Sequence, residues 1–328
     1  MVNCYAIIVL LFTALPVFAV GDSEEQFNLG LTFQKESHEF GASVEKTVLL
    51  QRAVVHFRSA VASRPDFYRA HVACGSTLLE LAQASTDSRQ RLISAQAAEE
   101  QFKIAARSSN ADWAVYHAWG SLLLYEVQAG LKSTEEQPET LREARDRFRA
   151  GLKLVAYSGD RSRMEIGSAQ CEYLFALRIR DPIEQRALYQ QVATDLEAAT
   201  RGSERAKTAE VYALWGAAFV QLGKLTNDPM LLRQGIERLL TGLETGDGKD
   251  AQTNYNLACA YALLGQTDAG LRHLHACLAN DPQRVFYKIA ASDQDLNGLR
   301  STPEFNRIFR PEPLDPSSPL LEPQPLSH

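Results

Sequence analysis

The 328-residue sequence predicts an all-α protein, a solenoid of about six helical hairpins closed by a C-terminal helical cap. Three observations predict this fold class. Apolar residues recur at helical spacing along most of the chain. A small residue followed three positions later by an apolar or aromatic one returns repeatedly between residues 24 and 282. Glycine or proline interrupts the pattern between successive helices, which indicates many hairpins rather than a few long helices.

The clearest repeat spans residues 254–282, with the sequence NYNLACAYALLGQTDAGLRHLHACLANDP. Its small residue is Ala258, a break follows at Gly265, and Asp281-Pro282 ends the second helix. The face of the first helix is marked by Leu257, Ala258 and Tyr261, and that of the second by Gly270, Leu274 and Cys277. Upstream copies carry their small residue at Gly30, Gly75, Gly120 and Gly216, and a weaker copy begins at Ile166.

The spacing of the copies predicts unusually long hairpins. The second-helix anchors are Ala53, Ala98, Ala144, Val192, Gly235 and Gly270, separated by 45, 46, 48, 43 and 35 residues. The excess lies between the two helices of a copy and amounts to about three helical turns. We therefore expect helices of roughly 18–20 residues in the first four hairpins. The alternative is ordinary hairpins with long loops, of which residues 133–138 would be one.

This pattern resembles the tetratricopeptide repeat (TPR), with Asn254 in place of the usual Trp and Gly270 in place of the usual Ala. The resemblance implies a right-handed superhelical solenoid whose first helices line a concave groove. Small residues at Gly75, Gly120, Gly216 and Ala258 are expected to let the helices of a hairpin approach closely. Phe57, Phe102 and Phe148 are expected to fill the space between one hairpin and the next.

The N-terminal residues predict export. Ala6 to Val20 is an apolar run that is short for a membrane-spanning helix of about 20 residues. Val17 and Ala19 stand at −3 and −1 of a signal-peptidase site, so residues 1–19 are interpreted as a signal peptide. We expect a periplasmic or secreted protein. The alternative is an uncleaved anchor through residues 6–20, which would hold the chain at a membrane, because the first five residues include no Lys or Arg.

The repeat domain is predicted over residues 20–290, followed by capping helices over 291–310 and a disordered Pro-rich tail over 311–328. The cap would cover the last hairpin with apolar side chains such as Leu296, Leu299 and Phe305. Aspartates preceding apolar-periodic runs are expected to cap helices. They are Asp66, Asp87 and Asp112.

Composition restricts the classes of function. The apolar fraction of 45% and charged fraction of 23% are typical of a folded domain. A net charge of −6, without a basic cluster, argues against nucleic-acid binding. Beyond Cys4 there are four cysteines, an even number that in an exported chain favours disulfides. Their spacing favours buried thiols instead, and Cys74 and Cys277 fall at core positions.

A search for catalytic or metal-binding motifs finds none. Gly242–Lys249 lacks the first glycine of a phosphate-binding loop, and no strand precedes it. His273 and His275 are two residues apart, so on a helix they cannot share a metal. Adjacent acidic residues fall on polar faces or loops. The sequence therefore predicts a protein that is not an enzyme, with no cofactor and no metal.

The predicted function is an exported TPR scaffold or adaptor that mediates protein–protein interactions in the periplasm or cell envelope. Its partner would be a protein or peptide. The Lys/Asn clamp with which some TPR proteins hold a carboxylate terminus is missing, which argues against an acidic C-terminal tail. The alternatives are a non-catalytic accessory subunit of an envelope enzyme or assembly complex, and a self-associating structural protein. The groove could also be filled by the chain itself. The groove positions are Val72, Ser76, Leu79, His117, Ser121, Leu124, Tyr125, Ala213, Ala217, Val220, Gln221, Tyr255, Cys259 and Ala262.

Overall fold

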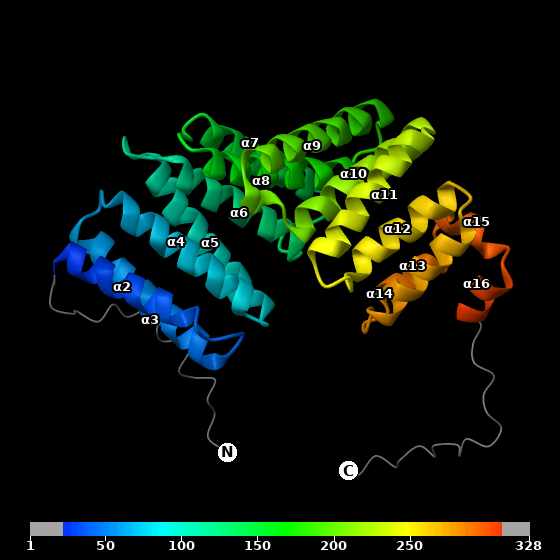
Figure 1. Cartoon of the computed structure of the whole chain (residues 1–328). Coiled ribbons are helices and arrows are strands. Elements are labelled where there is room, and N and C mark those ends of the chain that lie inside the picture. Colours follow the sequence, from blue (N-terminus) through cyan, green and yellow to red (C-terminus); the bar gives the residue numbers. More distant parts are fainter. Residues whose placement is uncertain (1–21, 310–328) are drawn as a thin grey trace, which may run out of the picture. The chain divides into compact units, whose positions relative to one another are not determined.

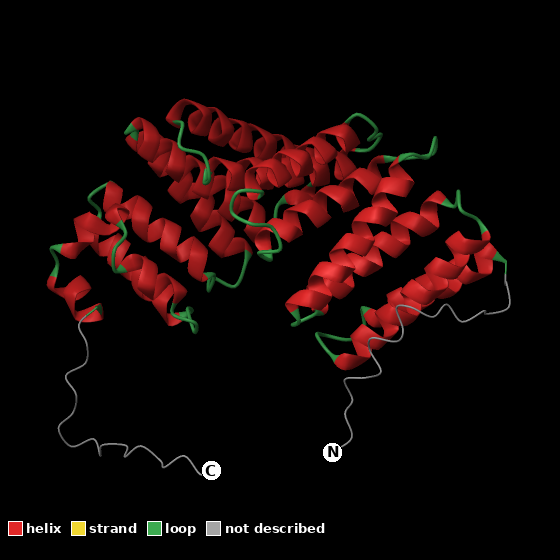
Figure 2. Cartoon of the chain, turned by 180° about the vertical axis from the view of Figure 1, so that it is seen from behind, coloured by secondary structure: helices red, strands yellow, loops and turns green. Residues whose placement is uncertain are grey.

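A computed structural model describes residues 22–309, so the predicted signal peptide and Pro-rich tail lie outside the described residues. The described chain is built from antiparallel helical pairs and contains no strand (Figures 1 and 2). Its contacts fall into two compact units, Met1–Ala206 and Lys207–His328, which we call unit 1 and unit 2. No described helix is long and apolar enough to cross a membrane.

Unit 1 contains four hairpins, and unit 2 contains two hairpins followed by the cap. The hairpins of unit 1 are α2 (Ser23–Ser37) with α3 (Val44–Ser63), α4 (Tyr68–Ala84) with α5 (Ser88–Ala106), α6 (Trp113–Gln128) with α7 (Gln137–Leu152), and α8 (Ser158–Ala176) with α9 (Pro182–Gly202), followed by the 3-10 turn η2 (Glu204–Ala206). Those of unit 2 are α10 (Ala209–Thr226) with α11 (Pro229–Thr245) and α12 (Ala251–Leu263) with α13 (Thr267–Ala279). The cap consists of α14 (Val285–Ala290), η3 (Gln294–Leu296), α15 (Asn297–Arg300) and α16 (Pro303–Ile308).

The prediction of about six hairpins is confirmed. The first four are lengthened, although α2, α6 and α7, with 15, 16 and 16 residues, fall short of the predicted 18–20, and the α10–α11 hairpin, with 18 and 17 residues, is lengthened as well. Helices of unit 1 have 15 to 21 residues, whereas α12 and α13 have 13 each. The segment predicted as a long loop is only partly one. Its last residues, Gln137 and Pro138, already form the first turn of α7, where proline fits because its missing N–H has no intrahelical partner.

Two of the three predicted aspartate caps are confirmed. The Asp87 carboxylate accepts a hydrogen bond from the Arg89 N–H at 2.8 Å, and that of Asp112 accepts one from Ala114 at 2.9 Å. The prediction for Asp66 is wrong, because α4 begins after Phe67 without a side-chain cap. The Phe67 ring is buried against Phe27, with ring centroids 5.0 Å apart, and this packing fixes where α4 starts.

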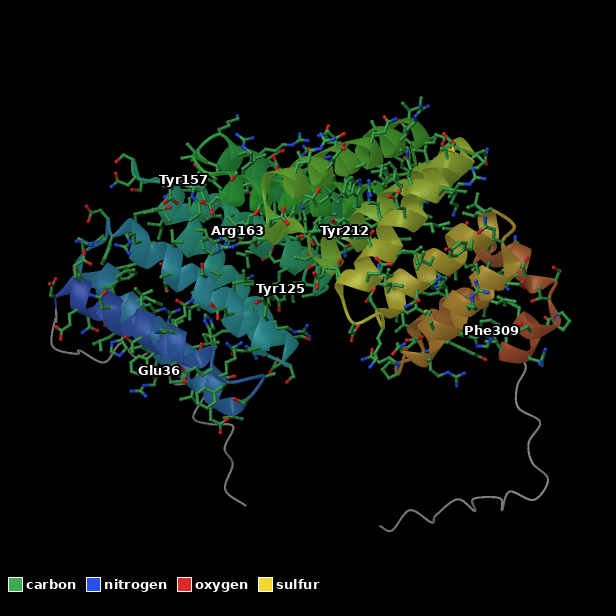
Figure 3. All side chains as sticks on the ribbon, in the orientation of Figure 1. Glu36, Tyr125, Tyr157, Arg163, Tyr212 and Phe309 are labelled. Carbon is green, nitrogen blue, oxygen red and sulfur yellow. The ribbon has the colours of Figure 1, made fainter. Side chains whose placement is uncertain are left out.

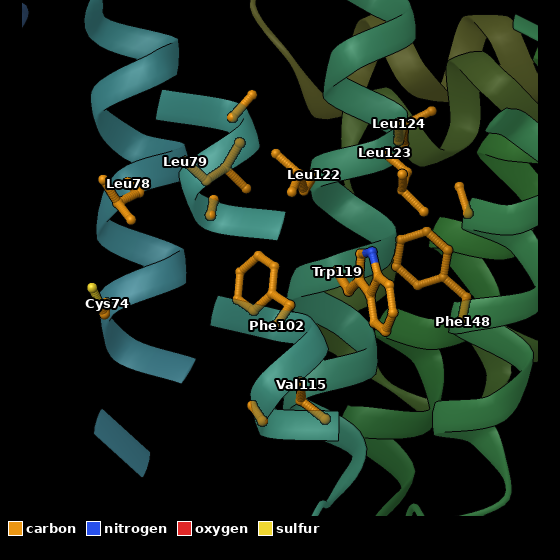
Figure 4. Packing of buried hydrophobic residues seen from close by; sticks show 14 of the residues in the cluster. Cys74, Leu78, Leu79, Phe102, Val115, Trp119, Leu122, Leu123, Leu124 and Phe148 are labelled. Atoms are coloured by element: carbon orange, nitrogen blue, oxygen red, sulfur yellow. The ribbon is translucent and has the colours of Figure 1, made fainter. Parts of the chain in front are cut away.

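Three phenylalanines of unit 1, Phe57, Phe102 and Phe148, lie against glycines of their own hairpins. A Cβ atom on Gly75 would lie 2.6 Å from the Phe102 ring, and one on Gly120 would lie 2.9 Å from that of Phe148. The prediction that these rings fill the space between hairpins is therefore incomplete. Of these three rings, only that of Phe148 is also packed against a glycine of the next hairpin, Gly167 on α8. Figure 4 shows Phe102 and Phe148 within this core. The same ring-on-glycine contact joins Gly30 to Phe57.

The α10–α11 hairpin of unit 2 closes differently. A Cβ atom on Gly216 would lie 2.8 Å from the backbone oxygen of Gly235, and one on Gly235 would lie 2.9 Å from that of Gly216. The two backbones are therefore in direct contact, as predicted for Gly216. The residue of α11 at the position of the phenylalanines is Leu239, which is fully buried.

In five of the six hairpins a side chain of the second helix reaches back to the first helix, in an arrangement we call the cross-brace. This side chain stands immediately before Phe57, Phe102, Phe148, Leu239 or Leu274. In three hairpins it is a hydrogen bond between histidine and an amide, 2.8–2.9 Å long. In two others an arginine lies over a tryptophan ring, an attractive cation–π contact. The histidine braces are His56–Gln26, Gln101–His71 and His273–Asn254, and the arginine braces are Arg147 over Trp119 at 3.7 Å and Arg238 over Trp215 at 4.3 Å.

The cap buries apolar side chains against the last hairpin. Leu296, Leu299 and Phe305 are almost fully buried and share one cluster with Leu271 and Leu274 of α13. These are the side chains that the sequence assigned to the cap. The cap supplies the last hairpin with the neighbour that every other hairpin obtains from the next repeat.

Candidate functional site

The groove positions predicted on α4 and α6 of unit 1 divide into exposed and buried members. We call Val72, Ser76, His117, Ser121 and Tyr125, all partly exposed, the unit 1 face. The other two predicted positions, Leu79 and Leu124, are 8% and 6% exposed and belong to the hydrophobic core. They support the face from beneath, because successive first helices α4 and α6 are in contact. The binding role of these positions stays a prediction.

The unit 1 face offers neutral polar groups rather than charges. The Ser76 and Ser121 hydroxyls have no hydrogen-bond partner between residues 22 and 309, so a ligand would find them available. The Tyr125 hydroxyl donates to the Ala82 carbonyl at 2.8 Å, which fixes its ring between α4 and α6. Figure 3 marks Tyr125.

His117 is held against aromatic rings, with the Phe148 centroid 5.9 Å away and Trp113 at 6.3 Å. Burial lowers the pKa of His117, and the nearby Arg163 lowers it further, while Asp160 acts in the opposite direction. The imidazole is therefore neutral at pH 7. In that state it can donate one hydrogen bond and accept another.

Polar contacts between consecutive first helices hold the unit 1 face in place. At one end, Gln34 of α2 and His38, which follows α2 as its C-cap, hydrogen-bond to the Glu80 carboxylate of α4 at 2.8 and 3.0 Å. At another, the Tyr68 hydroxyl donates to the Asp112 carboxylate at 2.5 Å. Partial burial and this hydrogen bond raise the pKa of Tyr68, so the phenol keeps its proton. These contacts fix the spacing of the helices that a ligand would cross.

The cap covers the predicted groove positions of the last repeat, Tyr255, Cys259 and Ala262. The Tyr255 hydroxyl donates to Asp293 at 2.5 Å, and the Lys224 ammonium lies 2.6 Å from Asp295. A Cβ atom on Gly298 would lie 3.0 Å from the Ala262 carbonyl. Five of the predicted positions are buried, namely Ala217, Val220, Tyr255, Cys259 and Ala262, while Ala213 and Gln221 stay partly exposed. For the last repeat, the chain itself occupies the predicted groove.

Cys259, Asp293 and Asp295 bring three potential metal ligands within 4.8 Å of one another. The Lys224 ammonium already neutralises Asp295, and Tyr255 donates to Asp293. Burial, the larger effect, and the neighbouring aspartates raise the pKa of the Cys259 thiol, which opposes the thiolate that a metal needs. We interpret the cluster as a polar attachment of the cap to α10 and α12.

Sequence reasoning missed two buried carboxylates in unit 1, Glu126 and Glu172, each 1% exposed. Glu172 pairs with Arg149, yet burial outweighs this pairing and raises the pKa of Glu172 to about 7. Burial also raises the pKa of Glu126, against the opposing effect of Lys132 at 3.1 Å. Both residues stand next to apolar core positions of a helix, and such interruptions of an apolar face are the signal that could have revealed them.

The four cysteines beyond residue 4 are free and buried. Burial raises the pKa of Cys74 and of Cys277 to about 12, so both thiols keep their protons at neutral pH. They act as small apolar side chains of the core.

No family model and no curated protein matches the chain. Among solved structures, the chain is similar to pilF of Pseudomonas aeruginosa, with a TM-score of 0.50 and 15% identity over 84% of this chain and 94% of that one. It also matches TTC0263, a thermophilic TPR protein of Thermus thermophilus, with a TM-score of 0.44 and 14% identity over 66% of this chain and 96% of that one. At such identities the likeness concerns the fold alone. Together with the repeat register, the likeness to pilF shows that the chain has the all-α fold of tetratricopeptide-repeat proteins.

Proposed function

We propose that this protein is an exported scaffold that binds a segment of another protein on the unit 1 face. One observation carries the proposal. The first helices of unit 1 present partly exposed apolar and neutral polar side chains, whereas the matching positions of the last repeat are covered by the cap. A surface that the chain leaves open in one unit and covers in the other is the better candidate for a partner.

The chemistry of the unit 1 face defines the kind of partner. Ser76, Ser121 and neutral His117 can exchange hydrogen bonds with a peptide backbone, and Val72 and Tyr125 provide apolar contact. None of these side chains is charged at neutral pH. The partner is therefore a helical or extended segment with apolar and uncharged side chains, and the binding should depend little on salt. We propose no catalytic role.

The first test is a cross-linked pull-down from an envelope extract with the chain starting at Val20. A Ser76→Arg/Ser121→Arg variant places two long charged side chains on the unit 1 face. The matched control, Gln96→Arg/Ala198→Arg, places the same charges on exposed positions of α5 and α9. We expect a defined protein to be recovered with the unmodified chain and the control, and lost with the face variant. Equal recovery by all three chains would refute the unit 1 face as the site.

The proposed location rests on the N-terminal sequence and needs its own test. Expression from Met1, followed by mass spectrometry of the mature N-terminus, should give a chain that begins at Val20 in a fraction outside the cytoplasm. A chain that retains Met1 and stays with membranes would instead support the anchor.

A further inference from the structure

The first hairpin of unit 1 has an apolar outer face. In each first helix, one residue stands directly before the small residue of the repeat pattern. Apart from the weaker copy that begins at Ile166, this residue is buried in every repeat except the first. Leu29 is 37% exposed, whereas its counterparts are at most 6% exposed. These counterparts are Cys74, Trp119, Trp215 and Leu257. The first hairpin has no preceding second helix between residue 22 and its own start to cover this position.

The second helix of the same hairpin adds a row of valines. Val44, Val48 and Val55 recur at i, i+4 and i+11, so they lie on one face of α3. They are 75%, 47% and 41% exposed. Two positions after the second-helix anchor, where Val55 stands, the other five hairpins carry polar or charged residues: Glu100, Asp146, Thr194, Glu237 and Arg272. The repeat position is normally polar, and only the first hairpin makes it apolar.

The first and the last hairpin differ in how their outer sides are covered. The outer side of the last hairpin is covered by Leu296, Leu299 and Phe305 of the cap. Terminal repeats need either such a cover or a polar outer face. The first hairpin has neither among the described residues, and Figure 1 shows α2 and α3 at the edge of unit 1. Its exposed apolar side chains therefore call for a partner surface.

The exposed apolar area matches what a dimer needs. With full accessible areas of about 150–200 Å² for such side chains, the exposed fractions of Leu29, Phe40, Val44, Val48 and Val55 leave roughly 400 Å² of apolar surface. A stable interface of standard size buries about 800 Å² per partner, of which somewhat more than half is apolar. One copy of the hairpin therefore supplies about the apolar surface that one side of such an interface requires.

Charges on the first hairpin are also self-complementary. Glu25, Leu29 and Glu36 recur at i, i+4 and i+11, which gives α2 an acidic edge beside Leu29. Figure 3 marks Glu36. On α3, Arg52 lies over the Phe33 ring at 3.9 Å and forms no ion pair with any residue from 22 to 309. An antiparallel arrangement of two copies would bring Arg52 of each copy to the acidic edge of the other.

We propose that two copies of this chain associate through the outer faces of their α2–α3 hairpins, around a two-fold axis. The same patch then contacts itself, which gives a closed dimer. The outer side of the last hairpin cannot serve as the acceptor in a head-to-tail filament, because the cap covers it. The interface shares no residue with the unit 1 face, so this inference goes beyond the proposed function and stands or falls separately from it.

Sedimentation velocity of the chain from Val20 to His328, across the micromolar range, tests the proposal. We expect a dimer that dissociates on dilution. A Val48→Glu/Val55→Glu variant should associate at least tenfold more weakly while its helical circular dichroism is unchanged. The matched control, Ile93→Glu/Ile104→Glu, changes two exposed residues of α5, 38% and 39% exposed, and should dimerise normally.

A charge exchange provides a second, independent readout. Arg52→Glu should weaken the dimer, and adding Glu36→Arg should restore it. A chain that stays monomeric at all concentrations would overturn the proposal, as would a dimer that tolerates the two glutamates on α3. If the mature chain is monomeric and only the chain from Met1 is destabilised by these glutamates, the dimer is refuted and the occupant is the apolar segment 6–20 of the same chain.

Discussion

The hairpins of unit 1 and the α10–α11 hairpin of unit 2 use the same repeat position in two ways. In unit 1 the glycine makes room for a phenylalanine ring, as with Gly120 and Phe148. In α10–α11 a Cβ atom on Gly216 would also meet a side chain, that of Leu239, but there the backbones of Gly216 and Gly235 touch as well. Both solutions fill the space between two helices at the density of a protein interior. They differ in what can move, because a ring can shift where a backbone carbonyl cannot.

The comparison shows that a glycine in a repeat sequence has no single structural meaning. Its role depends on the residue that the partner helix places opposite it. The Phe102 ring makes Gly75 a socket for a side chain, whereas Gly235, which stands at the position of Ala98, allows contact between the two backbones. Three experiments test how the cores of the two units differ in stability, in order of decreasing expected effect.

Removal of the Phe148 ring should have the largest effect on stability. Phe148→Ala leaves a cavity against Gly120 and Gly167, glycines of two different hairpins, and should lower the free energy of unfolding by about 3–5 kcal/mol. Urea unfolding followed by tryptophan fluorescence measures it, since Trp113 and Trp119 lie in unit 1. The control is Tyr157→Ala, an aromatic side chain of unit 1 that is 76% exposed, which should change stability by about a few tenths of a kcal/mol. Similar losses for both variants would contradict the socket description.

A pH dependence of stability should be a property of unit 1. The carboxyl groups whose pKa is raised within residues 22–309 all lie there: Glu126, Glu165, Glu172 and Asp195. Because the pKa of Glu172 is about 7 in the folded state and 4.5 in the unfolded chain, the folded chain holds this proton more tightly. The stabilisation is complete below pH 4.5 and is lost as the pH rises through 7, by about 2 kcal/mol between about pH 5.5 and 8.5.

A Glu172→Gln variant isolates this effect, because glutamine keeps a hydrogen-bond acceptor for Arg149 without the titrating group. The difference in melting temperature between the two proteins should change in favour of the variant as the pH rises. The pKa values of His56, His117 and His273 are lowered, so the stabilisation that these neutral histidines contribute is lost as the pH falls below 6.5. Both proteins contain the same histidines, so this contribution cancels in the difference. A difference that is constant with pH would show that Glu172 stays ionised in the folded chain.

The smallest effect should distinguish the two kinds of glycine directly. Gly216→Ala places a methyl group 2.8 Å from a backbone oxygen and should destabilise unit 2 by about 1–2 kcal/mol, even after the helix-propensity gain of alanine. Gly120→Ala meets only ring atoms at 2.9–3.0 Å, which can shift, so its net effect should be under about 1 kcal/mol. Amide hydrogen exchange in α11 and in α7 locates each effect. If Gly120→Ala lowered the stability more than Gly216→Ala did, the proposed difference between the two kinds of glycine would be wrong.

The sequence was sufficient for the hairpins because each one repeats the same local signals. Gly75 and Phe102, or Asp87 at a helix start, report on contacts between residues that are near in the chain. The cross-braces were missed although they recur, because His56, Gln101 and Arg147 share a position but not a residue type. Their common role becomes apparent only when the facing side chain is known.

The groove was predicted less well for a physical reason. Whether a first-helix side chain is exposed depends on the neighbouring first helix and on the cap, neither of which is local. Leu79 is buried by packing into the core, and Tyr255 is covered through a hydrogen bond to Asp293, 38 residues further along the chain. Helical periodicity places a residue on a face but does not say what lies over that face.

The order of the last hairpin and the cap along the chain has a consequence for biosynthesis. The last hairpin is complete when Ala279 has been added, but its outer leucines are covered only after Leu296 to Phe305 have followed. At ordinary rates of translation this takes about 1–5 s. A ribosome that stalls in this interval, or a message truncated there, would release a product with all its hairpins and an exposed leucine cluster. Quality-control proteases that recognise exposed apolar residues would thereby distinguish a finished chain from one that lacks the cap.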